Sequence, residues 1–332
     1  MRFLYRLVLI VVLMIIISYV TIHEYNDDSE VVKPEEVVFA PSALNRLDDV
    51  ARTCDVTSPI KWRERRLPGQ HRLGIVVPYK NRMKELQTFV PHMEKFLKAQ
   101  GVDHEYFITN QLDDWRFNRG SLLNIGAIMS GAFDCDYIAL HDVDLLPNQI
   151  ELNYRFPEKG PYHVAAPGLH PKYKFSKFLG GILIMSKANY MQINGFSNKF
   201  WGWGKEDDEF RRRILLQDLQ IYRPPQLKSG QKSTFIHIHG EERERDTKRT
   251  GGQRKIFDTT DVTNGYNTTT WDDACINQIT IANRQVNMVE VNLMCDKKET
   301  PWCEPGLPED PLTPEELAKQ AKQEAKKRKR RP

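Results

Sequence analysis

Residues Tyr137–Pro147 read YIALHDVDLLP, an apolar run that ends in two aspartates. The apolar part predicts a buried strand over Tyr137–His141. Upstream, Leu73–Pro78 predicts another buried apolar strand, and Glu105–Thr109 predicts a second strand after it. The sequence therefore places a pair of carboxylates directly after the third of three predicted strands.

Helical patterns separate these strands. Met83–Ala99 predicts two helices broken at Pro91, and Gly120–Phe133 predicts another helix. Strands and helices that alternate in this order form a parallel sheet, the mononucleotide-binding half of a doubly wound α/β fold. In such a sheet, ligands bind outside the carboxyl ends of the strands.

Residues of opposite charge follow two of the strands at that edge. Asp142 and Asp144 point to the same side, because side chains alternate along extended backbone. Such a pair suits a hard divalent cation that also bridges a diphosphate, and the alternative is a turn that ends the strand. The first strand is followed by a basic segment, Pro78-Tyr79-Lys80-Asn81-Arg82.

Two histidines repeat this spacing. His237 and His239 share one face of a short strand predicted after Ser233–Phe235. A cation held by Asp144, His237 and His239 would keep its remaining positions for phosphate oxygens. This mixture of imidazole and carboxylate suits manganese better than calcium. Two histidines on a solvated strand are the alternative.

The segment Phe200–Glu209, FWGWGKEDDE, combines tryptophans, glycines and carboxylates. Tryptophan faces stack on sugar rings, and Gly202 and Gly204 let a loop approach a ligand or move as a lid. The acidic residues open a predicted helix and complement its dipole, so helix capping explains part of the run. A carboxylate beside such a platform can also act as a general base toward a sugar hydroxyl.

Phe117-Asn118-Arg119 lies just before the helix predicted over Gly120–Phe133. Arg119 can pair with a diphosphate, and Phe117 can flank a base. A helix entry capped by Asn118 explains the same residues equally well.

The ends of the chain indicate a membrane-anchored lumenal protein. Of the 332 residues, 1–6 are predicted as a cytoplasmic tail, 7–22 as a signal-anchor transmembrane helix, 23–70 as a stem, 71–304 as one globular domain and 305–332 as a basic, disordered tail. A cleaved signal peptide is the alternative, although no small-x-small cleavage site follows the apolar run. Much of the net charge of +4 comes from Lys326–Arg331, which argues against a nucleic-acid-binding surface on the folded part.

The 5 cysteines fit a lumenal protein with one or two disulfides and at least one free thiol. Cys295 and Cys303 are the expected pair. Asn267-Thr268-Thr269 is the N-glycosylation sequon, and its polar, turn-rich setting suits a surface loop.

Four motifs resemble those of the β-1,4-galactosyltransferase family: VVPYKNR, FNRGSLLNIGA, DYIALHDVDLLP and GFSNKFWGWGKEDDEF. They occur in order over about Arg72–Cys303. Within the family, the chain is similar to the branch that adds galactose to protein-linked xylose. The features that favour this branch are DVDLLP, FPEKGPYHVAAPGLHPKY and the His-x-His pair.

This resemblance implies a GT-A fold, a Rossmann-like mixed sheet with flanking helices, in a single-pass type II Golgi membrane enzyme. It implies inverting, manganese-dependent transfer of galactose from UDP-galactose to the 4-hydroxyl of xylose on a proteoglycan core protein, by a catalytic domain over residues 71–304. Asp144, His237 and His239 are then the metal ligands, and Asp207 is the general base. The sugar-binding residues would be Tyr173, Trp203, Glu206 and Asp208, and the nucleotide pocket would be lined by Pro78, Tyr79, Lys80, Arg82, Phe117, Arg119 and Asp142.

The sequence departs from the family at two of these places. Phe175 stands where a second tyrosine would line the acceptor site, and phenylalanine makes the contact there apolar instead of hydrogen-bonding. Lys80 cannot reproduce the fork that an arginine offers to a phosphate.

Other functions stay open on the sequence alone. A same-class alternative is a β-1,4-galactosyl- or N-acetylgalactosaminyltransferase that acts on N-acetylglucosamine, against which the His-x-His pair and the region of Tyr173 speak. A non-catalytic lumenal glycan-binding homologue would not need Asp207 beside a metal. A metal-dependent phosphoesterase uses the same acid and imidazole side chains but leaves the tryptophan segment without a purpose.

Overall fold

The structure is a computed structural model that describes residues 52–55, 57–225, 227, 233–238, 246–248, 251–308 and 318. The predicted signal anchor, most of the stem, His239 and the basic run Lys326–Arg331 lie outside the described residues. Within the described part, no helix is both long and apolar enough to cross a membrane.

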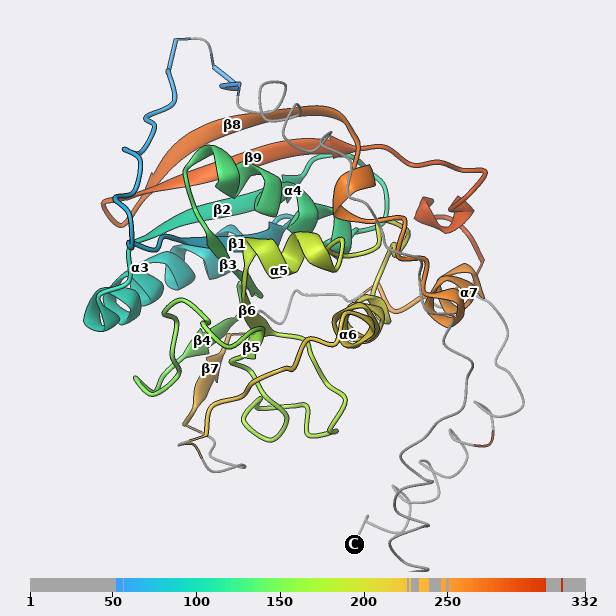
Figure 1. The fold of residues 1–332 in the computed structure, drawn as a ribbon. Coiled ribbons are helices and arrows are strands. Elements are labelled where there is room, and N and C mark those ends of the chain that lie inside the picture. Colours follow the sequence, from blue (N-terminus) through green and yellow to red (C-terminus); the bar gives the residue numbers. More distant parts are fainter. Residues whose placement is uncertain are drawn as a thin grey trace, which may run out of the picture. The chain divides into compact units, whose positions relative to one another are not determined.

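A sheet of seven strands forms the centre of the fold, in the order β5, β6, β3, β1, β2, β9, β8 (Figure 1). The strands are β1 (Leu73–Tyr79), β2 (His104–Gln111), β3 (Tyr137–His141), β5 (Tyr162–His163), β6 (Ile182–Ser186), β8 (Trp271–Ile281) and β9 (Arg284–Leu293). Strands β3, β1, β2 and β9 run parallel, and β5, β6 and β8 pair antiparallel at the two edges. The predicted mixed α/β sheet is therefore confirmed. A separate two-stranded ribbon consists of β4 (Leu145–Pro147) and β7 (Phe235–His237).

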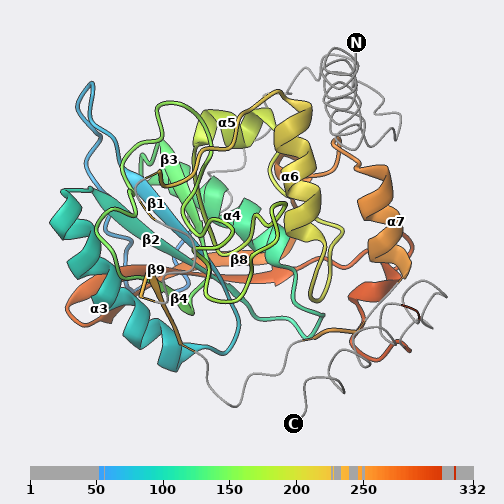
Figure 2. The ribbon, with the colours of Figure 1, turned by 90° about the horizontal axis from the view of Figure 1, so that it is seen from below.

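Helices cover both faces of the sheet. The helices are α3 (Met83–Gln100), α4 (Arg119–Ala132), α5 (Lys187–Gln192), α6 (Glu206–Leu216) and α7 (Gly251–Thr259), with 3-10 turns η2 (Tyr266–Thr268) and η3 (Pro301–Cys303). Because side chains alternate along β1, Val76 packs in a core with α4, α5 and α6, whereas Ile75 and Val77 pack in another core with α3. Figure 2 shows α3 on one side of the strands and α4 with α6 on the other.

The prediction of two helices broken at Pro91 is wrong, because α3 continues through this residue. Pro91 is exposed, and it removes only one backbone donor from the helix. The opposite side of α3 is buried in the core through residues such as Phe89, Met93 and Leu97. Packing of this apolar stripe outweighs the local cost of the proline.

The sheet opens at the carboxyl end of β1. Pairing between β1 and β2 continues to Tyr79, whereas pairing between β1 and β3 ends at Val76 opposite Leu140. Pro78 has no N–H group, which suits a position where only one neighbouring strand remains. Since β2 and β3 lie on opposite sides of β1, this is the point where the strand order reverses and where ligands of open α/β sheets bind.

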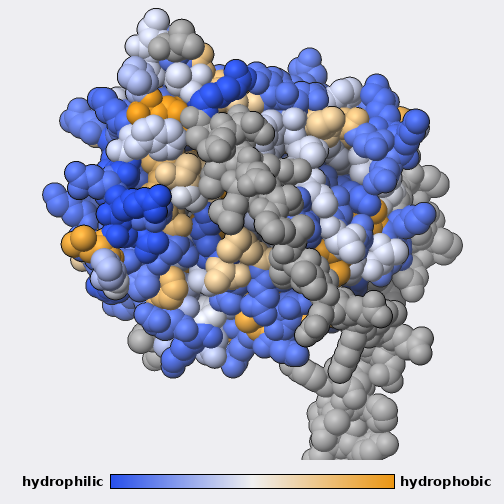
Figure 3. Space-filling model, turned by 45° about the horizontal axis from the view of Figure 1, so that its top comes forward, coloured by the Kyte–Doolittle hydropathy of each residue, from blue (hydrophilic) through white to orange (hydrophobic). Residues whose placement is uncertain are grey.

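Two disulfides fasten segments to the sheet. Cys54 bonds to Cys275 in β8, and Cys295 bonds to Cys303, the expected pair. Cys135 is buried and, among the described residues, is the free thiol. The face of the molecule in Figure 3 is largely hydrophilic, with apolar residues alone or in small groups, which is normal for a protein surface in water.

Candidate active site

Asp144 and His237 are brought together by the β4–β7 ribbon. Leu145 pairs with His237 across the two strands, and the N–H of Ile238 donates to the backbone oxygen of Asp144 at 2.9 Å. The carboxylate Oδ1 of Asp144 consequently lies 3.9 Å from Nε2 of His237. Both side chains are largely shielded from solvent, with 7% and 19% of their surfaces exposed.

These two donor atoms fit a shared metal ion. Bonds of about 2.1 Å from a carboxylate oxygen and an imidazole nitrogen allow the donors to stand up to about 4.2 Å apart. The observed 3.9 Å lies within this limit, so one ion can bind both residues. Arg82 also approaches this carboxylate, with Nη2 3.4 Å from Oδ2 of Asp144. His239 lies outside the described residues, so its part in the metal site remains a prediction.

Asp142 faces a different partner. The guanidinium of Arg119 donates to its Oδ1 from Nη2 at 2.8 Å and from Nε at 3.2 Å, and Nη1 lies 4.0 Å from Oε1 of Glu206. Burial lowers the pKa of Arg119, but the charges of Asp142 and Glu206 outweigh burial and raise that pKa above its ordinary value. Arg119 thus links the end of β3 to the start of α6 by charge. Asn118 caps α4, accepting from the N–H of Ser121 at 2.9 Å, as the alternative interpretation of this segment predicted.

The first turn of α6 carries Glu206, Asp207 and Asp208, as predicted. The N–H of Asp208 donates to Oδ1 of Asp207 at 2.9 Å. Burial, together with the charge of Asp208, raises the pKa of Asp207, and burial with the charge of Asp207 raises the pKa of Glu206 to about 7. A carboxylate with a raised pKa is a stronger base, which suits Asp207 for taking a proton from a hydroxyl group.

Gly180 lies against Asp207. A Cβ atom at this position would stand 2.9 Å from Oδ2 of Asp207 and 2.8 Å from the ring of Phe178, closer than real Cβ contacts allow. The absence of a side chain therefore keeps space beside Oδ2. Neither Gly180 nor Phe178 was identified from the sequence as a site residue, because a Gly-Gly pair before a strand is an ordinary turn signal.

A row of aromatic rings lies between the carboxylate of Asp207 and the Asp144–His237 pair. The ring of Phe178 lies 4.8 Å from that of Tyr173 and 5.5 Å from that of Phe175, which is 52% exposed. His170 lies 5.1 Å from Phe178 and 6.0 Å from His237. Sequence reasoning did not single out His170, although it lies in the motif FPEKGPYHVAAPGLHPKY that favours the xylose branch.

Three residues predicted to line the nucleotide pocket lie at the end of β1 or directly after it. Pro78 and Tyr79 are buried at the end of β1. Lys80 donates from Nζ to the carbonyl oxygens of Asp113 (2.6 Å) and Trp115 (3.3 Å), so its ammonium group supports the connection between β2 and α4.

The remaining predicted residues lie on loops and turns. Phe117 is partly buried, and its carbonyl oxygen accepts from the N–H of Gly202 at 2.8 Å. The side chain of Trp203 is 51% exposed, as a stacking platform requires. Asn267 lies in η2 with a partly buried side chain, and its N–H donates to Oδ1 of Asn194 at 2.9 Å, so glycosylation there remains a prediction.

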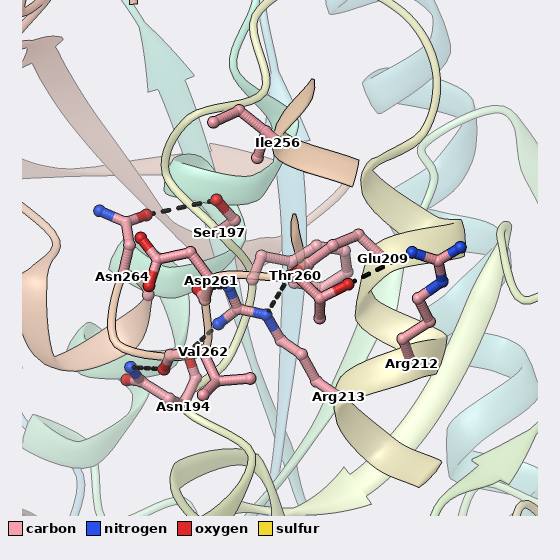
Figure 4. A network of polar contacts seen from close by, with 12 residues as sticks. Asn194, Ser197, Glu209, Arg212, Arg213, Ile256, Thr260, Asp261, Val262 and Asn264 are labelled. Atoms are coloured by element: carbon pink, nitrogen blue, oxygen red, sulfur yellow. Dashed lines mark hydrogen bonds and ion pairs between the residues drawn. The ribbon is translucent and has the colours of Figure 1, made fainter. Parts of the chain in front are cut away.

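A buried polar network holds α6 in place (Figure 4). Arg213 donates from Nε to Oε1 of Glu209 at 2.7 Å, and both side chains are 0% exposed. Arg213 also donates to the backbone oxygens of Asn194 (3.2 Å) and Asp261 (2.8 Å). The helix turn that carries Asp207 is therefore anchored by an ion pair one turn further along.

The chain matches family models and known relatives of the galactosyltransferases. One matching family model is described as the N-terminal domain of galactosyltransferase and covers residues 160–240, and another is described as the N-terminal region of glycosyl transferase group 7 and covers residues 29–156. The chain is 45% identical over 246 residues to β-1,4-galactosyltransferase 7 of Homo sapiens, which is 74% of this chain and 75% of that protein. It is 41% identical over 237 residues to xylosylprotein 4-β-galactosyltransferase of Caenorhabditis elegans, 70% of this chain and 82% of that protein.

Two crystal structures share the fold. One is the catalytic domain of Drosophila β-1,4-galactosyltransferase 7 with xylobiose, at 43% identity and a TM-score of 0.68, over 71% of this chain and 99% of that chain. The other is a mutant of the Drosophila protein with manganese, UDP-Gal and xylobiose, at 42% identity and a TM-score of 0.68, over 71% of this chain and 100% of that chain.

Proposed function

The chain belongs to the β-1,4-galactosyltransferase family, and from this premise we propose that it transfers galactose from UDP-galactose to the 4-hydroxyl of xylose on a proteoglycan core protein, with inversion at the anomeric carbon. The observation that carries the proposal is that the Asp144–His237 pair and the partly buried carboxylate of Asp207 lie at one edge of the sheet, where Arg119 bonds to Asp142 and approaches Glu206. The xylobiose and UDP-Gal in the Drosophila structures support the choice of acceptor and donor.

The donor end of the reaction depends on charge. Asp144 and His237, with His239, would hold manganese, which when bound supplies Lewis acidity to stabilise the departing diphosphate. Arg82 and Arg119 add positive charge at the same edge, and Asp142 holds Arg119 in position. The nucleotide would lie along residues at the end of β1 and just after it, at the start of α4 and just before it, and directly after β3: Pro78, Tyr79, Lys80, Arg82, Phe117, Arg119 and Asp142.

The acceptor end depends on Asp207. Its Oδ1 accepts the N–H of Asp208, so Oδ2, beside Gly180, is the oxygen that takes the proton from the 4-hydroxyl. Inversion requires one in-line displacement, so no protein nucleophile is needed. Trp203 would stack on the sugar, and the residues that hold the two sugars by polar or ring contact would be Tyr173, Glu206 and Asp208.

The proposed cellular setting is argued from the apolar N-terminal segment and from the disulfides. We propose residues 7–22 as the anchor of a single-pass type II Golgi membrane protein, with the stem over 23–70 and the catalytic domain over 71–304 in the lumen. The two disulfides support an oxidising compartment.

A donor and acceptor panel tests this function. The purified protein is assayed with UDP-galactose and UDP-N-acetylgalactosamine against a β-xyloside and an N-acetylglucosaminide, each with and without Mn²⁺. We expect product only from UDP-galactose and the xyloside, and only with the metal. Preference for the N-acetylglucosaminide would support the other branch of the family, and binding of glycans without any product would support a non-catalytic homologue.

A further inference from the structure

Arg116 is a buried residue at which separate segments of the chain meet, and the proposed reaction gives it no task. Only 3% of its side chain is exposed. Its guanidinium donates two hydrogen bonds to the carboxylate of Asp246, from Nε to Oδ2 at 2.6 Å and from Nη2 to Oδ1 at 3.0 Å. Paired, charge-assisted bonds of this kind are both strong and specific in geometry.

The same side chain reaches two further pieces of backbone. Nη2 donates to the backbone oxygen of Lys248 at 2.9 Å, and Nη1 donates to that of Trp302 at 3.1 Å. The backbone N–H of Arg116 donates to the oxygen of Cys303 at 2.9 Å, and the disulfide to Cys295 fastens this turn to the end of β9. Arg116 is therefore bonded to η3, while its guanidinium also binds the segment Asp246–Lys248.

This arrangement continues to Trp203. The N–H of Trp203 donates to the backbone oxygen of Asp246 at 2.9 Å, and the N–H of Gly202 donates to that of Phe117, the residue after Arg116, at 2.8 Å. The backbone that carries the exposed indole is thus bonded on both sides of the contact with Arg116: Trp203 to Asp246, its ionic partner, and Gly202 to Phe117, its neighbour in the chain.

Gly202 has a steric reason to be glycine. A Cβ atom on this residue would stand 3.0 Å from Nε of Arg116 and closer still to its other guanidinium atoms, and the backbone φ of +84° is one that side chains rarely adopt. The sequence led us to expect a glycine that frees a loop to move or to approach a ligand. In the structure, this glycine instead lets Arg116 pack directly against the loop.

We propose that Arg116 is a positioning residue for Trp203: acting through Asp246 and Gly202, it fixes the backbone that presents the indole to the acceptor sugar. This inference rests on the proposed function for the identity of the ligand, but not for the contacts. Lysine at this position keeps the charge and loses the fork, so it cannot bind both oxygens of Asp246 and the oxygen of Lys248 together.

The direct test is amide hydrogen exchange of the full protein without ligands. Arg116→Lys should raise the exchange rate of the Gly202 and Trp203 amides by about 10-fold or more, since their acceptors lose their support. Arg72→Lys is the matched control. Arg72 is also buried and ion-paired, through Nε to Asp103 at 2.8 Å, but it precedes β1 at the opposite end of the strand from the site. Unchanged protection of Gly202 and Trp203 in Arg116→Lys would overturn the inference, whatever the activity of the protein.

A double-mutant cycle then tests the effect on the acceptor. Arg116→Lys should raise KM for the xyloside by about 10-fold with little change in KM for UDP-galactose, and the same change in a Trp203→Ala background should have almost no further effect. Arg72→Lys should combine additively with Trp203→Ala. Additive effects of Arg116→Lys and Trp203→Ala would contradict the positioning role. Wild-type protein that leaves every xyloside unmodified would instead refute the proposed function, and the exchange experiment would still decide the role of Arg116.

Discussion

The ion pair between Glu209 and Arg213 offers a quantitative test of how α6 is held. The pair is fully buried, and Arg213 also donates to the backbone oxygens of Asn194, Gly195 and Asp261 (Figure 4). Arg213→Leu would leave the Glu209 carboxylate buried without its cation, a change that costs about 3–5 kcal/mol. The lost bonds to backbone oxygens add about 1 kcal/mol each.

The free energy of unfolding should therefore fall by at least about 5 kcal/mol. For a domain of this size, about 2–4 °C of melting temperature corresponds to each kcal/mol, so Tm should fall by about 10–20 °C. Calorimetry at pH 8 measures this shift. Because burial raises the pKa of Glu209, protonation of this carboxyl should relieve part of the loss at lower pH.

Two further variants separate the ion pair from general damage to the helix. The double variant Glu209→Leu/Arg213→Leu removes both charges and should recover most of the stability. Arg212→Leu is the matched control. This neighbouring arginine is partly exposed, bonds to the backbone oxygen of Phe257 at 2.6 Å and the hydroxyl of Thr260 at 3.3 Å, and lies over the Phe257 ring, so its loss should cost about 2–3 kcal/mol, well below the loss expected for Arg213→Leu. A fall in Tm below about 3 °C for Arg213→Leu would refute the view that the buried pair anchors α6.

Three further predictions concern the acidic turn. Asp207→Asn should lower kcat by about 100-fold or more while calorimetry finds UDP and Mn²⁺ binding nearly unchanged, because the base acts on the acceptor; unchanged turnover would remove Asp207 from that role. Burial raises the pKa of Glu206 to about 7, so between about pH 4.5 and pH 7 the folded state holds a proton that the unfolded state releases. The free energy of unfolding of the wild-type protein should therefore fall as pH rises through this range. Glu206→Gln should flatten this part of the Tm profile against pH, and an equal slope in both proteins would contradict the assigned shift. Gly180→Ala should displace Asp207 or Phe178 and lower kcat by about 10-fold or more with KM for UDP-galactose unchanged, whereas wild-type kcat would show that the space beside Oδ2 is not needed.

Local patterns in the sequence predicted much of the sheet. The strands β1 and β3 are buried along their whole length, so continuous apolar runs mark them clearly, whereas β2, HEYFITNQ, is marked by its three central residues Tyr106, Phe107 and Ile108. The acidic turn of α6 was equally readable, because first-turn carboxylates are a strong signal for the start of a helix. Pro91 was misread, since the sequence shows the missing donor but not the core that α3 packs against.

Contacts between distant segments could not be predicted from the residues alone. The ribbon that brings His237 to Asp144 is made of two strands of 3 residues each, too short to carry a pattern. The bond between Cys54 and Cys275 spans 221 residues, and cysteine spacing does not give connectivity. His170 and Gly180 reach the site only because the segment between β5 and β6 folds against α6 and β7.

The metal site can be tested most directly by pulsed electron paramagnetic resonance of Mn²⁺ bound to the protein with UDP. If Asp144 and His237 share the ion, the wild-type complex should show nitrogen coupling from imidazole, and this coupling should weaken in His237→Ala and in His239→Ala. Asp144→Asn should lower the affinity for Mn²⁺ while UDP is present. A wild-type complex without nitrogen coupling, or coupling that both histidine variants leave intact, would contradict the placement of the metal between this carboxylate and these imidazoles.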